Sequence, residues 1–213
     1  MAAIAIASLA VGNVAALAQR NVKRLLAYSS VSHAGFMLIG IAAASHLGAK
    51  ALAYYLIPYA AMSLGSFAVV AVRERELGMP VTLENLSGFG WERPFFGVGM
   101  WVFMLGFLGF PLTGGFIGKF YVFSAAYDSG FWWLIVVGVI ATMISAYYYL
   151  GIVRAMYFRE SSELQLAPAG GAPPREALVG IAVVVCLVVT VGSFFAVQPL
   201  IDVANAAANA LPL

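Results

Sequence analysis

The stretch Gly106–Tyr121, GFLGFPLTGGFIGKFY, lies within an apolar segment that runs from Pro94 to Asp128. That segment is longer than the ~20 residues that a helix needs to cross a bilayer. Pro111 removes a backbone donor and clashes with the preceding turn, and the glycines around it relax the backbone, so we expect the helix to break inside the membrane. Irregular backbone at that depth is tolerated where it is buried in protein or lines a wet cavity. The residues assigned to this break are Pro111, Gly114, Gly115 and Gly118.

Lys119 follows the break directly and lies well inside the apolar segment. A charged lysine at a helix centre costs on the order of 2.5 to 3.5 kcal/mol on insertion scales. Because a low-dielectric site disfavours the charged form, such a lysine can bind and release a proton. A broken helix supplies free backbone dipoles and room for water beside the lysine. The combination predicts a transport site.

The composition is that of an integral membrane protein. Apolar residues make up 63% of the chain and charged residues 9%, whereas about a quarter of the residues of an ordinary globular domain are charged. The net charge of +2 gives no indication of a nucleic-acid partner. Two histidines and one cysteine are too few for a zinc or iron–sulfur ligand set, so we expect no metal site.

Alternation of apolar segments and polar loops predicts an all-α, polytopic membrane helix bundle that forms a single domain over residues 1–213. About six transmembrane helices are expected, one of them discontinuous. The expected spans are residues 2–18, 25–45, 51–72, 95–127, 131–158 and 177–200. The first span has no basic region before it, which argues against a signal peptide. Because the chain starts inside a helix, it is also expected to be a fragment.

The expected loops differ in length and charge. Residues 46–50 are predicted to form a short polar turn, and residues 73–93 a long loop whose charges serve only solvation. Residues 159–176 are predicted to form a flexible aqueous loop, and residues 202–213 a short interfacial helix.

The second span carries a polar stripe. Asn21 is expected to cap its helix, which then places His33 near the middle of the membrane at 1.5 Å per residue. Ser29, Ser32 and His33 share one face by i, i+3 and i+4 spacing. Two interpretations of His33 remain open: a structural imidazole bonded to a neighbouring helix, and a proton relay.

The fifth span carries a second stripe. Thr142, Ser145 and Tyr149 fall on one face, which predicts hydroxyl groups that point into the bundle. With Ser29 and Ser32, they are the candidates for a polar path through the protein.

Three segments, NVKRLLAYSSVSHAGFMLIG, LENLSGFGWERP and GFPLTGGFIGKFYVFSAA, resemble membrane subunit N of NADH-quinone oxidoreductases, the respiratory complex I type of enzyme. The resemblance covers nearly the whole chain, but only the C-terminal part of the family. It corresponds to the second of two inverted five-helix repeats and to the final helix.

The resemblance implies redox-driven proton translocation. Lys119 matches a proton-carrying lysine on the family's discontinuous helix, and His33 matches a polar site on the same hydrated axis. No cofactor is expected in this chain, since NADH, FMN, iron–sulfur clusters and quinone would be bound by partner subunits. The implied partners are other membrane subunits of the enzyme, the lipid bilayer, protons and an N-terminal half on a separate chain.

The basic residues are distributed unequally between the two ends of the expected bundle. One, Lys50, lies in the loops on one side, and nine lie on the side of residues 19–24. The positive-inside rule then places both termini outside the cytoplasm, in a multi-pass protein of the cell inner (plasma) membrane. The nine are Arg20, Lys23, Arg24, Arg73, Arg75, Arg93, Arg154, Arg159 and Arg175.

Two alternatives to the proton-translocating subunit remain. The first is a subunit of a cation/proton antiporter, in which the same lysine exchanges protons against sodium. The second is a structural fragment without transport activity, in which Lys119 is only paired with a carboxylate.

Overall fold

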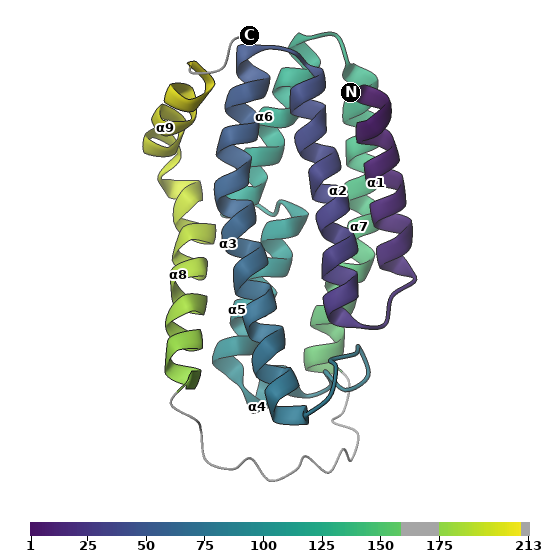
Figure 1. Ribbon diagram of the computed structural model, residues 1–213, viewed down its shortest axis with the longest axis vertical. Helices are drawn as coiled ribbons and strands as arrows, with labels where there is room; N and C mark the ends of the chain where they lie inside the picture. Colours follow the sequence, from purple (N-terminus) through teal and green to yellow (C-terminus); the bar gives the residue numbers. More distant parts are fainter. Residues whose placement is uncertain (159–174, 210–213) are drawn as a thin grey trace.

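The computed structural model describes residues 1–158 and 175–209, and helices account for most of them. The helices pack side by side along one common direction as a bundle (Figure 1). In chain order they are α1 (Ala2–Leu17), α2 (Val22–Ala42), α3 (His46–Leu77), α4 (Phe89–Glu92), α5 (Pro94–Leu108), α6 (Gly114–Asp128), α7 (Trp132–Phe158), α8 (Arg175–Phe195) and α9 (Val197–Asn209). The described residues contain no strand beyond an isolated bridge between Asn21 and Thr82.

Four helical segments are long and apolar enough to cross a membrane within the described ranges: α2, α3, α7 and residues Ala177–Phe195 of α8. Helices α1 and α5 are apolar but shorter. The predicted all-α membrane bundle is therefore confirmed. The boundaries of the individual spans remain predictions.

The predicted break in the fourth span is confirmed. Helix α5 ends at Leu108 and α6 begins at Gly114, and the two half-helices are joined by an irregular segment near the middle of the bundle (Figure 1). Gly109, with φ of 78°, and Leu112, with φ of 75°, turn the backbone through the left-handed region. The Gly109 amide donates to the Gly106 carbonyl at 3.0 Å, which closes the end of α5.

The glycines of α6 allow close packing in addition to relaxing the backbone. A Cβ atom on Gly114 would lie 1.9 Å from Ser193 Oγ, and one on Gly118 would lie 2.0 Å from Cδ2 of Tyr55. A Cβ on Gly115 would lie 2.0 Å from the Gly106 carbonyl oxygen. These three glycines therefore hold α6 against α3, α8 and the end of α5.

Helix α3 is longer at both ends than expected. It begins at His46, where the Ser45 side chain caps it by accepting a hydrogen bond from the Gly48 amide at 3.1 Å. The expected polar turn at residues 46–50 is therefore wrong, because the cap starts the helix there. At the other end the helix continues to Leu77 and is closed by Gly78, with φ of 64°.

The last expected span is divided into two helices. Helix α8 ends at Phe195 and α9 begins at Val197. Pro199 lies in the first turn of α9, where it is tolerated, whereas in a continuous helix its ring would clash with the Phe195 carbonyl. The expected interfacial helix at residues 202–213 thus starts earlier, and residues 210–213 lie outside the described residues, as does most of the predicted 159–176 loop.

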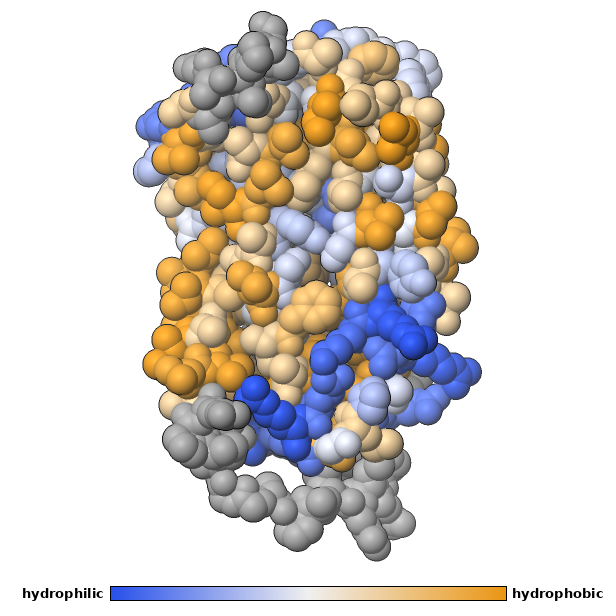
Figure 2. Space-filling view, viewed as in Figure 1, coloured by the Kyte–Doolittle hydropathy of each residue, from blue (hydrophilic) through white to orange (hydrophobic). Residues whose placement is uncertain are grey.

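The expectation that the charges of residues 73–93 serve only solvation is wrong. Arg73 is 2% exposed, and its guanidinium donates to Glu92 at 2.8 Å and to the Asn85 carbonyl at 3.2 Å. Arg93 pairs with Glu76 at 2.8 Å. These bonds fasten the loop to α3 at the end of the bundle where hydrophilic residues gather (Figure 2). A buried guanidinium needs such partners, because an unpaired charge in the interior is costly.

Two substitutions test the backbone conformation of the break. Gly109→Ala should lower the free energy of unfolding by about 1–2 kcal/mol, because alanine is strained at positive φ. The added Cβ would also lie 3.0 Å from Lys119 Cδ. Leu112→Gly should leave the free energy of unfolding unchanged or raise it, because glycine adopts the positive φ of this position without strain. Little packing is lost, since the Leu112 side chain is 54% exposed.

Thermal unfolding of the purified protein in detergent measures both changes. Equal midpoints for Gly109→Ala and the unsubstituted protein would contradict the role assigned to Gly109.

Candidate functional site

Lys119 lies in the second turn of α6, shortly after the break, and is only 6% exposed. Its Nζ atom donates to the Leu108 carbonyl at 3.1 Å and to Thr142 Oγ1 at 3.4 Å. Leu108 is the last residue of α5, and the last carbonyls of a helix have no partner within it. The C-terminal end of a helix also carries partial negative charge. The break therefore supplies an acceptor for a lysine that follows it along the chain.

No carboxylate forms an ion pair with Lys119 in the part of the chain that the structure describes. The polar partners of its amine are a carbonyl and a hydroxyl, both of them neutral. The Thr142 hydroxyl donates its own hydrogen to the Gly138 carbonyl at 3.0 Å, so its oxygen faces Lys119 as an acceptor.

An open cleft of about 240 Å³ lies beside Lys119. Apart from Lys119 and Thr142, its lining side chains are apolar. The lining residues are Leu108, Gly109, Phe116, Lys119, Phe120, Phe123, Val139, Thr142 and Met143.

His33 lies in the interior of the bundle at 2% exposure, with both ring nitrogens bonded. Nδ1 lies 2.8 Å from the Tyr55 hydroxyl, and Nε2 lies 2.9 Å from the Tyr149 hydroxyl. A neutral imidazole has one donor and one acceptor nitrogen, so one tyrosine donates and the other accepts. Helical spacing predicts Tyr149 on the inward face of its helix, whereas no pattern in the sequence points to a role for Tyr55.

Asn13 of α1 is a buried polar residue that was not among the candidates predicted from the sequence. Its amide donates to Ser32 Oγ at 2.9 Å, and its oxygen accepts from the Tyr148 hydroxyl at 3.1 Å. The signal was present, because an amide in an otherwise apolar, alanine-rich helix commonly bonds across to another helix. Asn13 thus connects α1, α2 and α7.

The remaining candidates for a polar path bond carbonyls of their own helices, and Ser29 also forms a side-chain hydrogen bond with Tyr149 of α7. Ser29 donates to the Leu26 carbonyl at 2.9 Å, and Ser145 donates to the Thr142 carbonyl at 2.8 Å. Both serines are buried and face the bundle, as their helical spacing predicts. Their role in a polar path remains a prediction.

The structure brings the lysine and the histidine into one interior region. Phe36 links them, since its ring centroid lies 4.5 Å from Lys119 Nζ and 6.2 Å from the His33 ring centroid. Within the described ranges, no group of three or more histidine, cysteine, aspartate or glutamate residues is placed to hold a metal ion.

Residues 1–145 match the family described as "NADH:quinone oxidoreductase/Mrp antiporter, TM". NADH-quinone oxidoreductase subunit N of Salinibacter ruber is 43% identical over 202 residues, which are 92% of this chain and 40% of that protein. The chain therefore spans well under half the length of this relative.

Solved structures give the same result. A chain of respiratory complex I from Thermus thermophilus superimposes with a TM-score of 0.78 at 36% identity, over 93% of this chain and 44% of that one. A chain of the Mrp complex from Dietzia superimposes with a TM-score of 0.84 at 22% identity, over 97% of this chain and 46% of that one, and shows a shared fold. Both the sequence match and the apolar helices identify a multi-pass membrane protein. The chain belongs to the NADH:quinone oxidoreductase/Mrp antiporter family.

Proposed function

We propose that the chain is part of a proton-translocating membrane subunit of an NADH-quinone oxidoreductase, which couples quinone reduction to proton transfer across the membrane. The observation that carries this proposal is the buried Lys119 beside the helix break, where only neutral groups of the described chain accept from its amine. Relatives at 40–47% identity that are named as subunit N support it.

The proposed mechanism is a protonation switch at Lys119. The charged form donates to the Leu108 carbonyl and to Thr142, and after losing its proton the amine still has hydrogens to donate to the same oxygens. Neither state therefore leaves these acceptors without a partner. The adjoining cleft gives the amine a route for proton exchange.

His33 is proposed as a relay on the same path. Tyr55 and Tyr149 occupy its two nitrogens from opposite sides, so a proton can arrive at one nitrogen while another leaves from the second. Such a transfer interchanges the donor and acceptor nitrogens of the ring.

The redox cofactors belong to other subunits in this proposal. NADH, FMN, iron–sulfur clusters and quinone would be bound there, and this chain would contribute proton transfer alone. Its partners are the other membrane subunits, the lipid bilayer and the remaining part of the subunit, on the same or a separate chain.

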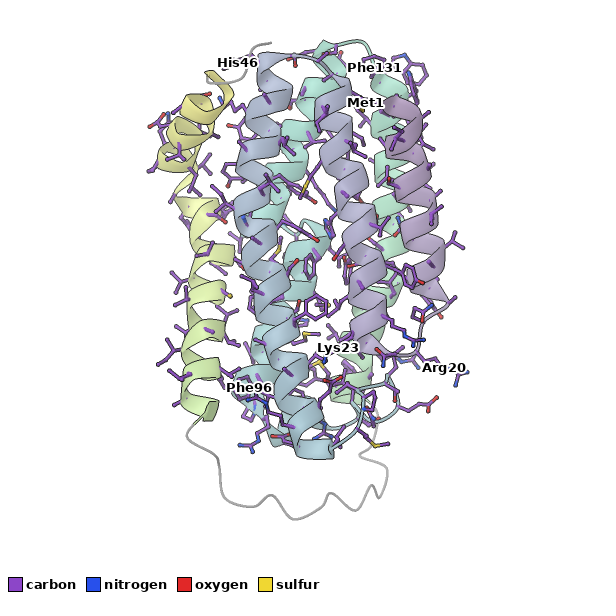
Figure 3. The ribbon with its side chains drawn as sticks, in the orientation of Figure 1. Met1, Arg20, Lys23, His46, Phe96 and Phe131 are labelled. Carbon is purple, nitrogen blue, oxygen red and sulfur yellow. The ribbon has the colours of Figure 1, made fainter. Side chains whose placement is uncertain are left out.

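The proposed orientation places both termini outside the cytoplasm of the cell inner (plasma) membrane. Met1, His46 and Phe131 lie at one end of the bundle, and Arg20 and Lys23 lie at the opposite end (Figure 3). The basic end would face the cytoplasm by the positive-inside rule.

Replacement of Lys119 tests the function. Lys119→Met should reduce proton translocation by the assembled enzyme in proteoliposomes by about tenfold or more, because the carrier is lost. Lys119→Arg should fail as well, since a guanidinium stays protonated.

Lys50→Met is the matched control, because Lys50 lies near the start of α3 with its amine 5.5 Å from the Tyr121 ring, outside the site. Subunit incorporation is measured in parallel. Normal pumping in Lys119→Arg, or loss of pumping only in step with loss of assembly, would refute the carrier role.

A cation/proton antiporter subunit is the second candidate, which the shared fold with the Mrp complex chain favours. The two functions differ in their ion. Under our proposal, removal of sodium from both sides of the proteoliposome membrane leaves the initial rate of proton transport unchanged. A rate that falls to background without sodium and returns with it would establish the antiporter.

A conservative change tests the relay. His33→Gln should slow pumping several-fold without stopping it, because an amide can bond both tyrosines but cannot relay a proton. Ser30→Ala is the control, since Ser30 bonds only the Leu26 carbonyl of its own helix in the described structure. Equal losses of assembly and pumping in His33→Gln would instead indicate a structural imidazole.

A further inference from the structure

The ammonium of Lys119 has a third neighbour besides its two oxygen acceptors. Nζ lies over the Phe36 ring, 4.5 Å from the centroid. Phe36 is 1% exposed and Lys119 is 6% exposed, so water does not screen this contact appreciably. A cation over an aromatic face at this distance is attracted by the ring quadrupole, most strongly when the pair is desolvated.

The ring discriminates between the two states of the lysine more completely than the two oxygens do. The Leu108 carbonyl and the Thr142 hydroxyl accept from both the ammonium and the neutral amine, although more strongly from the ammonium. The quadrupole attracts the positive charge and has little attraction for an uncharged amine. A contact that binds two states unequally shifts the equilibrium between them, so the ring adds to the stabilisation of the ammonium.

The ring is held in place by its neighbours. Phe36 packs against Phe123 of α6 with centroids 6.2 Å apart. A Cβ on Gly138 of α7 would lie 2.6 Å from Phe123 and 3.4 Å from Phe36, so this glycine lets α7 close over the pair. The ring is therefore positioned before the lysine is protonated.

The surrounding interior offers little other charge. Helix α5 has no ionisable residue, and the described structure places no carboxylate in an ion pair with Lys119. The ionisable side chains buried or half-buried in this interior are His33 from α2, Tyr55 and Tyr59 from α3, and Tyr148 and Tyr149 from α7.

We infer that Phe36 is a positioning residue that selectively stabilises protonated Lys119 through its ring face, and so sets how readily the lysine releases its proton. This inference rests on the proposed function of Lys119. It assigns an electrostatic role to Phe36, an apolar side chain that helical periodicity alone would place in the hydrophobic core.

Graded fluorination of the ring tests this inference in the assembled enzyme. Phe36 is replaced through nonsense suppression by phenylalanine with one, two or three ring fluorines, which weaken the ring quadrupole with little change of shape. Proton translocation is then measured in proteoliposomes across pH. With the cation less stabilised, Lys119 is loaded less readily, so the alkaline limb of the profile should move to lower pH with each fluorine. The total shift should be on the order of one pH unit.

The same analogues at Phe103 are the matched control, because Phe103 is fully buried in α5 against Gly65. Its profile should not move. An unchanged profile in the Phe36 series, or an equal shift at Phe103, would overturn the inference. If an analogue is not incorporated, Phe36→Tyr should keep the alkaline limb and Phe36→Leu should shift it, and identical profiles would likewise overturn the inference.

The Lys119 variants separate the two proposals. Normal pumping in Lys119→Met would remove the proposed function itself. If Lys119→Met abolishes pumping but the fluorinated Phe36 variants keep the same pH profile, only the role of Phe36 is refuted.

Discussion

A helix that ends inside a membrane leaves carbonyl groups without partners, and the bilayer offers no water to satisfy them. The end of α5 presents such a group at Leu108, and the structure satisfies it with the amine of Lys119 from the first turns of α6. A buried lysine and a terminated helix are each unfavourable alone. Lys119 Nζ lies 3.1 Å from the Leu108 carbonyl oxygen, so the amine gains an acceptor and the carbonyl gains a donor. The position of Lys119 shortly after the break therefore lowers the cost of both the buried lysine and the terminated helix.

The rest of the bundle maintains this arrangement by close packing. Gly115 touches the end of α5, while Gly114 and Gly118 let α6 approach α8 and the Tyr55 ring. Tyr55 in turn bonds His33, so the packing of α6 and the hydrogen bonds of the histidine share one side chain. A larger residue at Gly118 would therefore disturb both polar centres at once, because interiors packed to this density transmit displacement.

Local patterns in the sequence predicted those features that depend on local chemistry. Pro111 and the glycines predicted the break, and Asn21 was correctly predicted to cap α2, where it accepts from the Arg24 amide at 3.0 Å. The partners that a residue finds on another helix were not identified. Asn13, Tyr55 and the buried Arg73 all bond residues far away in sequence, and a single sequence carries no information on which helices are neighbours. The three glycines of α6 were assigned to relaxing the backbone for the same reason, since the atoms they admit lie mainly on other helices.

The two buried basic side chains differ in their partners, and the difference fits the proposed role of Lys119 as a proton carrier. Arg73, whose guanidinium remains protonated, is bonded to Glu92 and to a carbonyl, and it pairs with Glu76 at 3.4 Å. Lys119 has only neutral acceptors and an aromatic ring in the described chain. A carboxylate lowers the cost of a buried ion that stays charged, as Glu92 does at Arg73, because an unpaired buried ion is strongly unfavourable. Neutral partners keep the free energies of the charged and uncharged lysine closer together, and a group that exchanges protons requires that balance.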